Sequence, residues 1–379
     1  MSWTGCRRFK GEFLLPCAGQ TARIVTMRLR PFVLLLTTLP ALLAAQSHGP
    51  WVMQESGSSA SLRGIAAVNS SVAWASGTEG TVLRTEDGGA HWRKCAVPPG
   101  AEKLDFRGVQ AWDGETAVVM GSGPGELSRI YRTTDGCAHW TPVLRNPDKD
   151  GFFDGLLFLD RRNGLLIGDP VGGEIALQAT HDGGQSWSRV EDAEGLRALE
   201  GEAFFAASNA SMAAAGQWLW IATSKGRVLR HRLPADGTDL IGSTGFRSAQ
   251  APMAGGNAAA GIFAIAFRDE RNGVAVGGDY TKPDGASGTA AWTADGGEHW
   301  TAAAAGPPGY RSTVAWDKAA RAWIAAGTNG SDVSYDGGRT WRRLDGPEGG
   351  GWNAISLPWI VGPQGRVAKL DQKRMPHGK

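Results

Sequence analysis

Thr85-Glu-Asp87-Gly-Gly89-Ala-His-Trp92 is the first of five copies of one eight-residue phrase in this 379-residue chain. Each copy begins with a hydroxyl residue, has Asp two positions later and Gly three positions later, and ends in Trp. The other four copies are Thr133 to Trp140, Thr180 to Trp187, Thr293 to Trp300 and Ser334 to Trp341. The successive Trp residues are 48, 47, 113 and 41 positions apart. A recurrence at this period predicts an array of similar structural units.

The phrase itself has the chemistry of a tight turn between two strands. An Asp side chain accepts hydrogen bonds from backbone N–H groups just ahead of it, and Gly allows the positive φ that a chain reversal needs. Trp then offers a large apolar face to a neighbouring unit. We therefore expect structural roles, and no catalytic role, for the Asp and the Trp of each of the five copies: Asp87, Trp92, Asp135, Trp140, Asp182, Trp187, Asp295, Trp300, Asp336 and Trp341.

The phrase is similar to the Asp-box, or BNR repeat, which occurs in sialidases, sortilin-like receptors, some glucanases and photosystem II assembly factors. Because these hosts differ in activity, the resemblance implies a β-propeller and no particular reaction. A β-rich run precedes each box as the first strand of its unit. Seven such runs align, beginning at Arg63, Arg107, Asp154, Glu202, Ile262, Arg311 and Asn353. The 113-residue gap thus contains one unit without a box.

The last unit, about residues 352–371, has only three strand-like runs. Trp51 to Ser56 resembles the strand that follows each box and is expected to supply the missing outer strand, which closes the ring. The sequence therefore predicts an all-β fold, a seven-bladed β-propeller over residues 46–372, with a polar tail at 373–379.

The N-terminal region has the layout of an export signal. Met27-Arg-Leu-Arg30 is followed by an apolar run from Pro31 to Ala45 with small residues near its end, which predicts a signal peptide over residues 27–45. Residues 1–26 then form an extension upstream of a start at Met27. We expect a periplasmic or secreted protein with no transmembrane segment after cleavage.

Charge and cysteine content narrow the possible partners and compartment. The formal net charge is +2, from 39 basic and 37 acidic residues, which argues against a nucleic-acid partner. Cys95 and Cys137 fall in neighbouring units, and either a disulfide or two buried thiols fits their spacing. The His residues are scattered, so we expect no metal site and no cofactor.

The seven aligned runs place charged residues at one mouth of the central channel. Arg63, Arg107, Asp154, Glu202, Arg311 and Asn353 begin innermost strands, and neighbouring loops add Asp169, Asp279 and Tyr280. This ring either binds a ligand or consists of charges that pair around a water-filled channel. Both alternatives stay open at this point.

Four further phrases carry a closer resemblance: Ile167 to Gly173, Glu202 to Asn209, Gly261 to Phe267 and Val276 to Tyr280. With the boxes, they resemble the photosystem II stability/assembly factor-like family of exported bacterial propellers. The resemblance implies a non-catalytic protein-binding module in which an arginine patch contributes, with Arg63, Arg107 and Arg311 as counterparts by position. We therefore expect a monomeric binding propeller with a protein or glycan partner. The alternative is a sialidase- or glucanase-like glycoside hydrolase that uses Asp154 and Glu202.

Overall fold

The computed structural model describes residues 49–191, 194–234, 240–241, 245–344 and 350–378. The predicted signal peptide (27–45) and the extension before it (1–26) lie outside the described residues. Residues 47–379 form one unit of contacting elements. In the part of the chain that is described, no helix is long and apolar enough to span a membrane.

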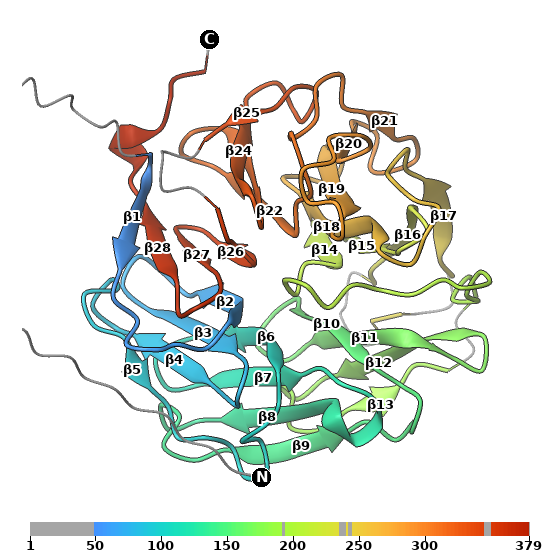
Figure 1. Ribbon diagram of the computed structural model, residues 1–379. Helices are drawn as coiled ribbons and strands as arrows, with labels where there is room; N and C mark the ends of the chain where they lie inside the picture. Colours follow the sequence, from blue (N-terminus) through green and yellow to red (C-terminus); the bar gives the residue numbers. More distant parts are fainter. Residues whose placement is uncertain (1–48, 192–193, 235–239, 242–244, 345–349, 379) are drawn as a thin grey trace, which may run out of the picture. The chain divides into compact units, whose positions relative to one another are not determined.

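Seven antiparallel four-stranded sheets follow one another around a ring, which confirms the predicted propeller (Figure 1). From the innermost strand outward, blade 1 consists of β2 Leu62–Ala67, β3 Ala73–Gly77, β4 Val82–Thr85 and β5 Arg93–Lys94. Blade 2 consists of β6 Phe106–Ala111, β7 Ala117–Gly121, β8 Arg129–Thr133 and β9 Thr141–Arg145. Blade 3 consists of β10 Phe153–Phe158, β11 Gly164–Val171, β12 Glu174–Thr180 and β13 Ser188–Arg189. Blade 4 consists of β14 Met212–Ala215, β15 Trp218–Ala222, β16 Arg227–Arg232 and β17 Arg247–Gln250. Blade 5 consists of β18 Ala260–Phe267, β19 Gly273–Asp279, β20 Ala290–Thr293 and β21 Thr301–Ala302. Blade 6 consists of β22 Thr313–Asp317, β23 Ala322–Gly327, β24 Gly330–Ser334 and β25 Arg342–Arg343.

Blade 7 combines both ends of the propeller. Its strands are β26 Ala354–Ser356, β27 Trp359–Val361, β28 Val367–Leu370 and β1 Trp51–Gln54, and β1 pairs antiparallel with β28. Trp51 is 9% exposed, donates a hydrogen bond from Nε1 to Ser331 Oγ (2.9 Å) and packs on Trp352. The predicted N-terminal strand therefore completes the last blade and also ties it to blade 6. Among the described residues, two short 3-10 helices, η1 Gly125–Leu127 and η2 Gln372–Arg374, lie outside the sheets.

The box turns have the predicted geometry. In the third box, Asp182 Oδ1 accepts hydrogen bonds from the Thr180 hydroxyl (2.8 Å) and from the backbone amide of Ser186 (3.0 Å). Thr180 Oγ1 in turn accepts from the backbone amide of Gly184 (3.0 Å). Burial raises the pKa of Asp182, but these hydrogen bonds and those from the Ser186 hydroxyl and the Gln185 amide outweigh it and bring the pKa to about 2. The carboxylate thus stays charged and holds the turn closed.

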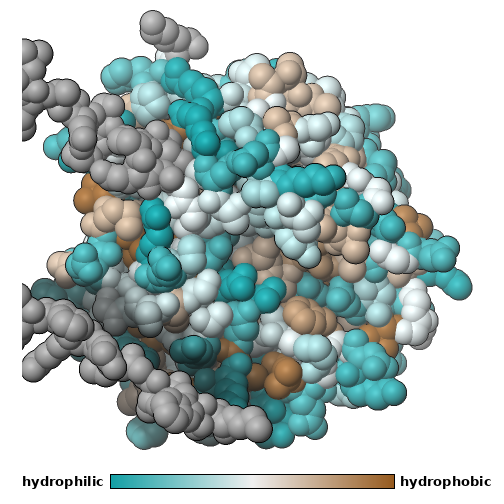
Figure 2. All heavy atoms as spheres, viewed as in Figure 1, coloured by the Kyte–Doolittle hydropathy of each residue, from teal (hydrophilic) through white to brown (hydrophobic). Residues whose placement is uncertain are grey.

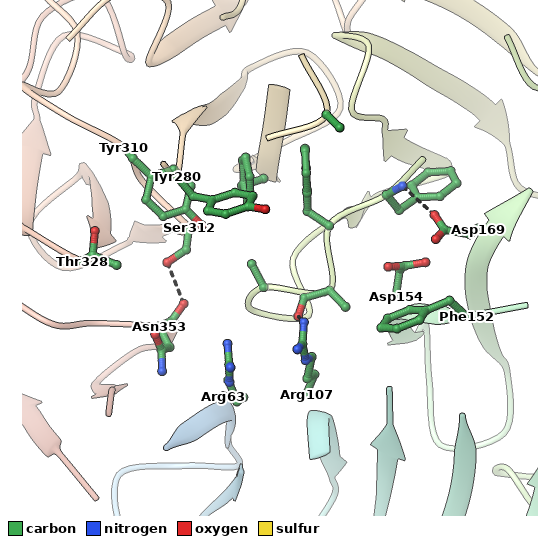
Figure 3. A pocket seen from close by; sticks show the side chains of 16 residues that line it. Arg63, Arg107, Phe152, Asp154, Asp169, Tyr280, Tyr310, Ser312, Thr328 and Asn353 are labelled. Atoms are coloured by element: carbon green, nitrogen blue, oxygen red, sulfur yellow. Dashed lines mark hydrogen bonds between the residues drawn. The ribbon is translucent and has the colours of Figure 1, made fainter. Parts of the chain in front are cut away.

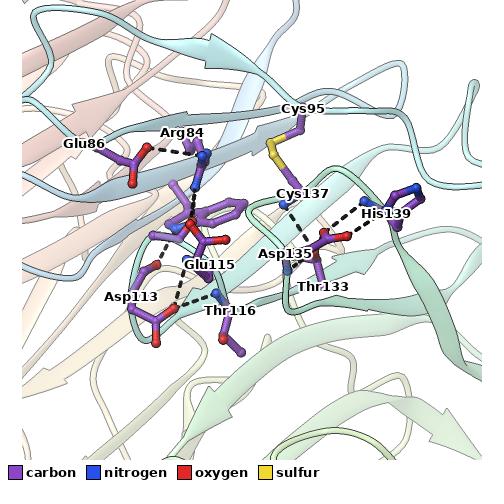
Figure 4. A network of polar contacts seen from close by, with 12 residues as sticks. Arg84, Glu86, Cys95, Asp113, Glu115, Thr116, Thr133, Asp135, Cys137 and His139 are labelled. Carbon is purple, nitrogen blue, oxygen red and sulfur yellow. Dashed lines mark hydrogen bonds and ion pairs between the residues drawn. A yellow bond between two sulfur atoms is a disulfide. The ribbon is translucent and has the colours of Figure 1, made fainter.

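The second box is joined to blade 1 by a covalent bond. Cys137 occupies the position of the second Gly, with φ of 67°, and forms a disulfide with Cys95, which follows β5. Figure 4 shows the disulfide beside the Asp135 turn, where Asp135 contacts Thr133 and His139. The bond links two neighbouring blades on the box side of the ring.

The hydrophobic core lies between the blades. Seven buried clusters of described residues each join two adjacent blades; one contains Trp74 of blade 1 with Trp140 of blade 2, and another contains Trp359 of blade 7 with Leu83 of blade 1. On the face shown in Figure 2, hydrophilic residues spread over the blades and hydrophobic ones form small groups among them. Each blade therefore depends on both neighbours for its apolar packing.

Blade 4 differs from the prediction. Its innermost strand is β14, whereas the run that begins at Glu202 forms an irregular segment that precedes it. Both runs are short and apolar, and blade 4 has no box to fix its register. The pairing of Met212 with Ile221 on β15 shows which run is the strand.

The closing strand can be tested with two substitutions on β1. Trp51→Ala should lower the free energy of unfolding by about 3–5 kcal/mol, because it removes a buried aromatic ring. Met53, 46% exposed on the same strand, serves as the control, and Met53→Ser should change stability by about 0.5 kcal/mol or less. Urea denaturation of both variants measures the difference. Equal stability of the two variants would contradict a closing role for Trp51.

Candidate functional site

A cavity of about 510 Å³ lies where the innermost strands begin, on the opposite side of the ring from the boxes. The boxes follow the third strand of a blade, which runs parallel to the first, so they lie at the far end of the sheet. Residues from or next to the innermost strands line the cavity, including Arg63, Arg107, Asp154, Phe263, Ser312 and Asn353. Ligand pockets in proteins commonly have about 300–1,000 Å³, so this volume suits a small molecule or a short peptide segment.

A repeated β-bulge positions the lining side chains. The pairing register shifts at the same place in blades 1, 2, 3 and 5, and the extra residues are Arg63, Arg107, Asp154 and Phe263. A bulge leaves one residue outside the ladder and re-aims its side chain. Gly64, Gly108 and Gly155 follow the three polar bulge residues. This local pattern explains why charged side chains of three successive blades reach the cavity.

Two arginines share one carboxylate on the side of blades 1 and 2. Arg107 Nε donates to Asp105 Oδ2 (2.8 Å), and Arg63 Nε lies 3.7 Å from Asp105 Oδ1. Arg107 Nη1 also donates to the carbonyl oxygen of Ala206 (3.2 Å). Burial lowers the pKa of Arg63, and Asp105 opposes this effect. Two guanidinium groups facing one carboxylate leave a net positive charge on this wall, which suits an anionic group.

Asp154 and Asp169 form the next wall. Figure 3 shows the two carboxyl groups facing each other, with Arg107 between Arg63 and Asp154. Asp154 is 2% exposed, and its burial, followed by the charge of Asp169, raises its pKa well above the usual range. Burial also raises the pKa of Asp169, while a hydrogen bond from the Phe204 amide to its Oδ1 (3.0 Å) opposes the rise.

Aromatic side chains cover a further side. Phe205 stacks on Phe263 with ring centroids 3.7 Å apart, and Tyr310 meets Phe263 edge-on at 4.6 Å. Tyr280 is 53% exposed and points into the cavity in Figure 3. Burial raises the pKa of Tyr310, so its hydroxyl stays protonated. The cavity therefore combines a basic, an acidic and an aromatic wall.

The structure brings together six of the nine residues expected at this mouth: Arg63, Arg107, Asp154, Asp169, Tyr280 and Asn353. Asn353 Nδ2 donates to the carbonyl oxygen of Leu62 (2.7 Å), and the Ser312 hydroxyl donates to the Asn353 carbonyl oxygen (2.8 Å).

The other three expected residues do not line the cavity. Glu202 is buried and paired with Arg227, which also holds its pKa low although burial alone would raise it. Arg311 is fully buried and bonded to Asp332. Asp279 closes a turn, in which it accepts hydrogen bonds from Thr281 and Asn257.

The sequence analysis missed two of the cavity residues because it aligned their strands one residue out of register. Gly64 pairs with Ser76, and the equivalent pairs are Ala264 with Val276 and Thr313 with Ala326. The counterparts of Arg63 are thus Phe263 and Ser312, each one residue after Ile262 and Arg311. A shift of one residue turns a side chain to the opposite face of a strand. Gly261 and Gly277 were the available signals in the sequence, whereas the bulge is seen only in the structure.

The buried pair and the cavity arginines should respond differently to substitution. Arg311→Ala should lower the free energy of unfolding by about 3–5 kcal/mol, because it leaves the Asp332 carboxylate buried without this guanidinium. Arg107→Ala should cost about 1 kcal/mol or less, because Arg107 is partly exposed. Chemical denaturation of both variants tests the distinction, and equal losses would contradict it.

Comparison with known proteins supports the fold and the family resemblance. The family model described as photosynthesis system II assembly factor YCF48 matches residues 43–225, through the first two strands of blade 4. No curated protein matches the chain. A structure of YCF48 bound to D1 peptide has a TM-score of 0.59 and 17% identity, over 85% of this chain and 97% of that chain.

Two other propellers are similar in fold. The GH74 xyloglucanase from Xanthomonas campestris has a TM-score of 0.53 and 16% identity, over 75% of this chain and 47% of that chain. The WD40 β-propeller domain of Doa1 has a TM-score of 0.54 and 11% identity, over 86% of this chain and 98% of that chain. At such identities these structures support the architecture alone. With its five boxes, seven blades and family match, the chain is an Asp-box β-propeller that resembles the photosystem II assembly factors.

Proposed function

We propose that this propeller is an exported, non-catalytic module that binds a segment of a partner protein in its central cavity. The observation that carries the proposal is the basic wall, where Arg63 and Arg107 face a single carboxylate, Asp105. Their side chains are 30% and 26% exposed, so both remain accessible from the cavity. A carboxylate from a partner gains charge-assisted hydrogen bonds from such a pair.

The family resemblance supports a protein partner. The structure of YCF48 bound to D1 peptide shows that a propeller of similar fold binds a peptide. The cavity of this chain adds an aromatic wall beside the arginines, and Tyr280 offers an exposed ring for an apolar side chain. Polar and aromatic groups together suit an extended peptide segment better than a simple ion.

The glycoside hydrolase alternative receives no support from the geometry. It requires two carboxyl groups on either side of a bond to be cleaved, for which Asp154 and Glu202 were the candidates. Glu202 instead forms an ion pair with Arg227 in a fully buried position. The similarity to the xyloglucanase covers less than half of that enzyme and concerns the fold.

Export is supported by two features that are independent of the cavity. The apolar run from Pro31 to Ala45 has the composition of a signal peptide. The disulfide between Cys95 and Cys137 is typical of proteins that fold in an oxidising compartment. We therefore propose that the mature protein works in the periplasm or outside the cell.

Capture of the partner from the native cell envelope tests the proposal. The tagged wild-type protein should retain a partner that the double variant Arg63→Gln, Arg107→Gln binds at least about 10-fold more weakly, because two charge-assisted contacts are lost. Arg145→Gln is the matched control, since Arg145 is 60% exposed on β9 and outside the cavity lining. Thermal denaturation verifies that both variants fold.

Two results would contradict the proposal. One is equal capture by the wild-type protein and the double variant. The other is glycoside turnover by the purified protein that is lost in Asp154→Asn, since this would make the cavity an active site.

A further inference from the structure

Two buried acidic side chains of the described residues are each matched with an arginine. Glu202 forms its ion pair with Arg227, and Asp332 forms one with Arg311. A buried carboxylate without a partner loses its hydration and gains nothing in return, which costs several kcal/mol or forces protonation. An unmatched acid at a cavity wall therefore calls for an explanation.

Asp154 is such an acid. Its side chain is 2% exposed, it lines the cavity, and its Oδ2 atom has no hydrogen-bond partner among the described residues. Asp169, which faces it in Figure 3, adds a second carboxyl group. Neither forms an ion pair with a Lys, Arg or His in the described part of the chain.

We propose that Asp154 and Asp169 form a subsite for a cationic side chain, Lys or Arg, of the protein segment that the cavity binds. This inference rests on the proposed function and specifies the chemistry of the partner. The basic wall receives an acidic group and the acidic wall receives a basic group, so the segment carries both. Because Arg107 lies between Arg63 and Asp154, the two subsites lie side by side on neighbouring walls (Figure 3).

The charges around Asp154 give the subsite a pH dependence. Burial and the neighbouring Asp169 raise the pKa of Asp154, while Arg107 and the backbone amides of Asp169 and Ala206 lower it to a smaller extent. The empty pair thus keeps a proton to higher pH than an ordinary carboxyl group. An incoming cation favours the ionised pair, so binding releases a proton and becomes tighter as the pH rises through the raised pKa.

A peptide library identifies the preferred chemistry directly. Beads carrying N-acetylated, C-amidated heptapeptides of random sequence are incubated with the wild-type protein, and the retained sequences are determined. We expect enrichment of peptides that contain a Lys or Arg together with an Asp or Glu. Blocked termini ensure that side chains supply the charges.

Variants then assign each charge to its subsite. A retained peptide should bind about 10-fold or more weakly to Asp169→Asn, with Asp154→Asn as a second variant, and replacement of its basic residue by glutamine should cause no further loss there. Glu115→Gln is the control, because Glu115 is 60% exposed in the β6–β7 turn. Wild-type affinity should rise from pH 5 to pH 8, and Asp169→Asn should reduce this dependence. Melting temperatures verify folding.

The possible outcomes separate this inference from the proposed function. Enrichment of acidic residues without basic ones, or of Asn and Gln in their place, would overturn the cation subsite and leave the binding function intact. Equal affinity of a basic peptide for the wild type and for both Asn variants would also overturn it. Failure to retain any class of peptide above the level of the Arg63→Gln, Arg107→Gln variant would contradict the proposed function itself.

Discussion

The pairing of β1 with β28 is the interaction on which the rest of the structure depends. Without it, blade 7 would have three strands and β28 would expose an unpaired edge. Trp51 adds a contact to blade 6 through Ser331, so one strand from the start of the chain secures two blades at its end. The cavity exists only because the ring is closed, since its walls come from innermost strands of neighbouring blades.

The architecture could be predicted from sequence because the boxes encode a local turn. The Thr180 hydroxyl, the Asp182 carboxylate and two Gly residues specify that turn within a few positions, and the Trp that follows marks the next strand. The closing strand could be predicted for a similar reason, since blade 7 lacked a run that Trp51 to Gln54 could supply. Blade 4 could not be placed in this way. It has no box, and the segment that begins at Glu202 is fixed by tertiary contacts, such as that between Phe204 and Asp169.

The cavity residues could be predicted only in part, because successive side chains of a strand point to opposite faces and an error of one residue selects the wrong one. Arg63, Arg107 and Asp154 were found because they begin three of the aligned runs, and the structure has a bulge at each of them. In blade 6 the equivalent strand pairing selects Ser312, and its neighbour Arg311 points into the core toward Asp332. In blade 5 it selects Phe263, so an aromatic ring stands where a charge stands in blades 1 to 3. The opposite walls of the cavity therefore differ in chemistry more than the repeat suggests.

The central claim is that the cavity, and not the box side or the outer edge, contacts the partner. Tyr280 is at the cavity and 53% exposed, whereas Met53 is 46% exposed on the outer strand of blade 7. A photo-cross-linking amino acid can be placed at either position and activated by light in the native envelope. The account predicts a cross-link to one partner protein from position 280 and none to that protein from position 53. A cross-link to the same partner from position 53 alone would contradict it.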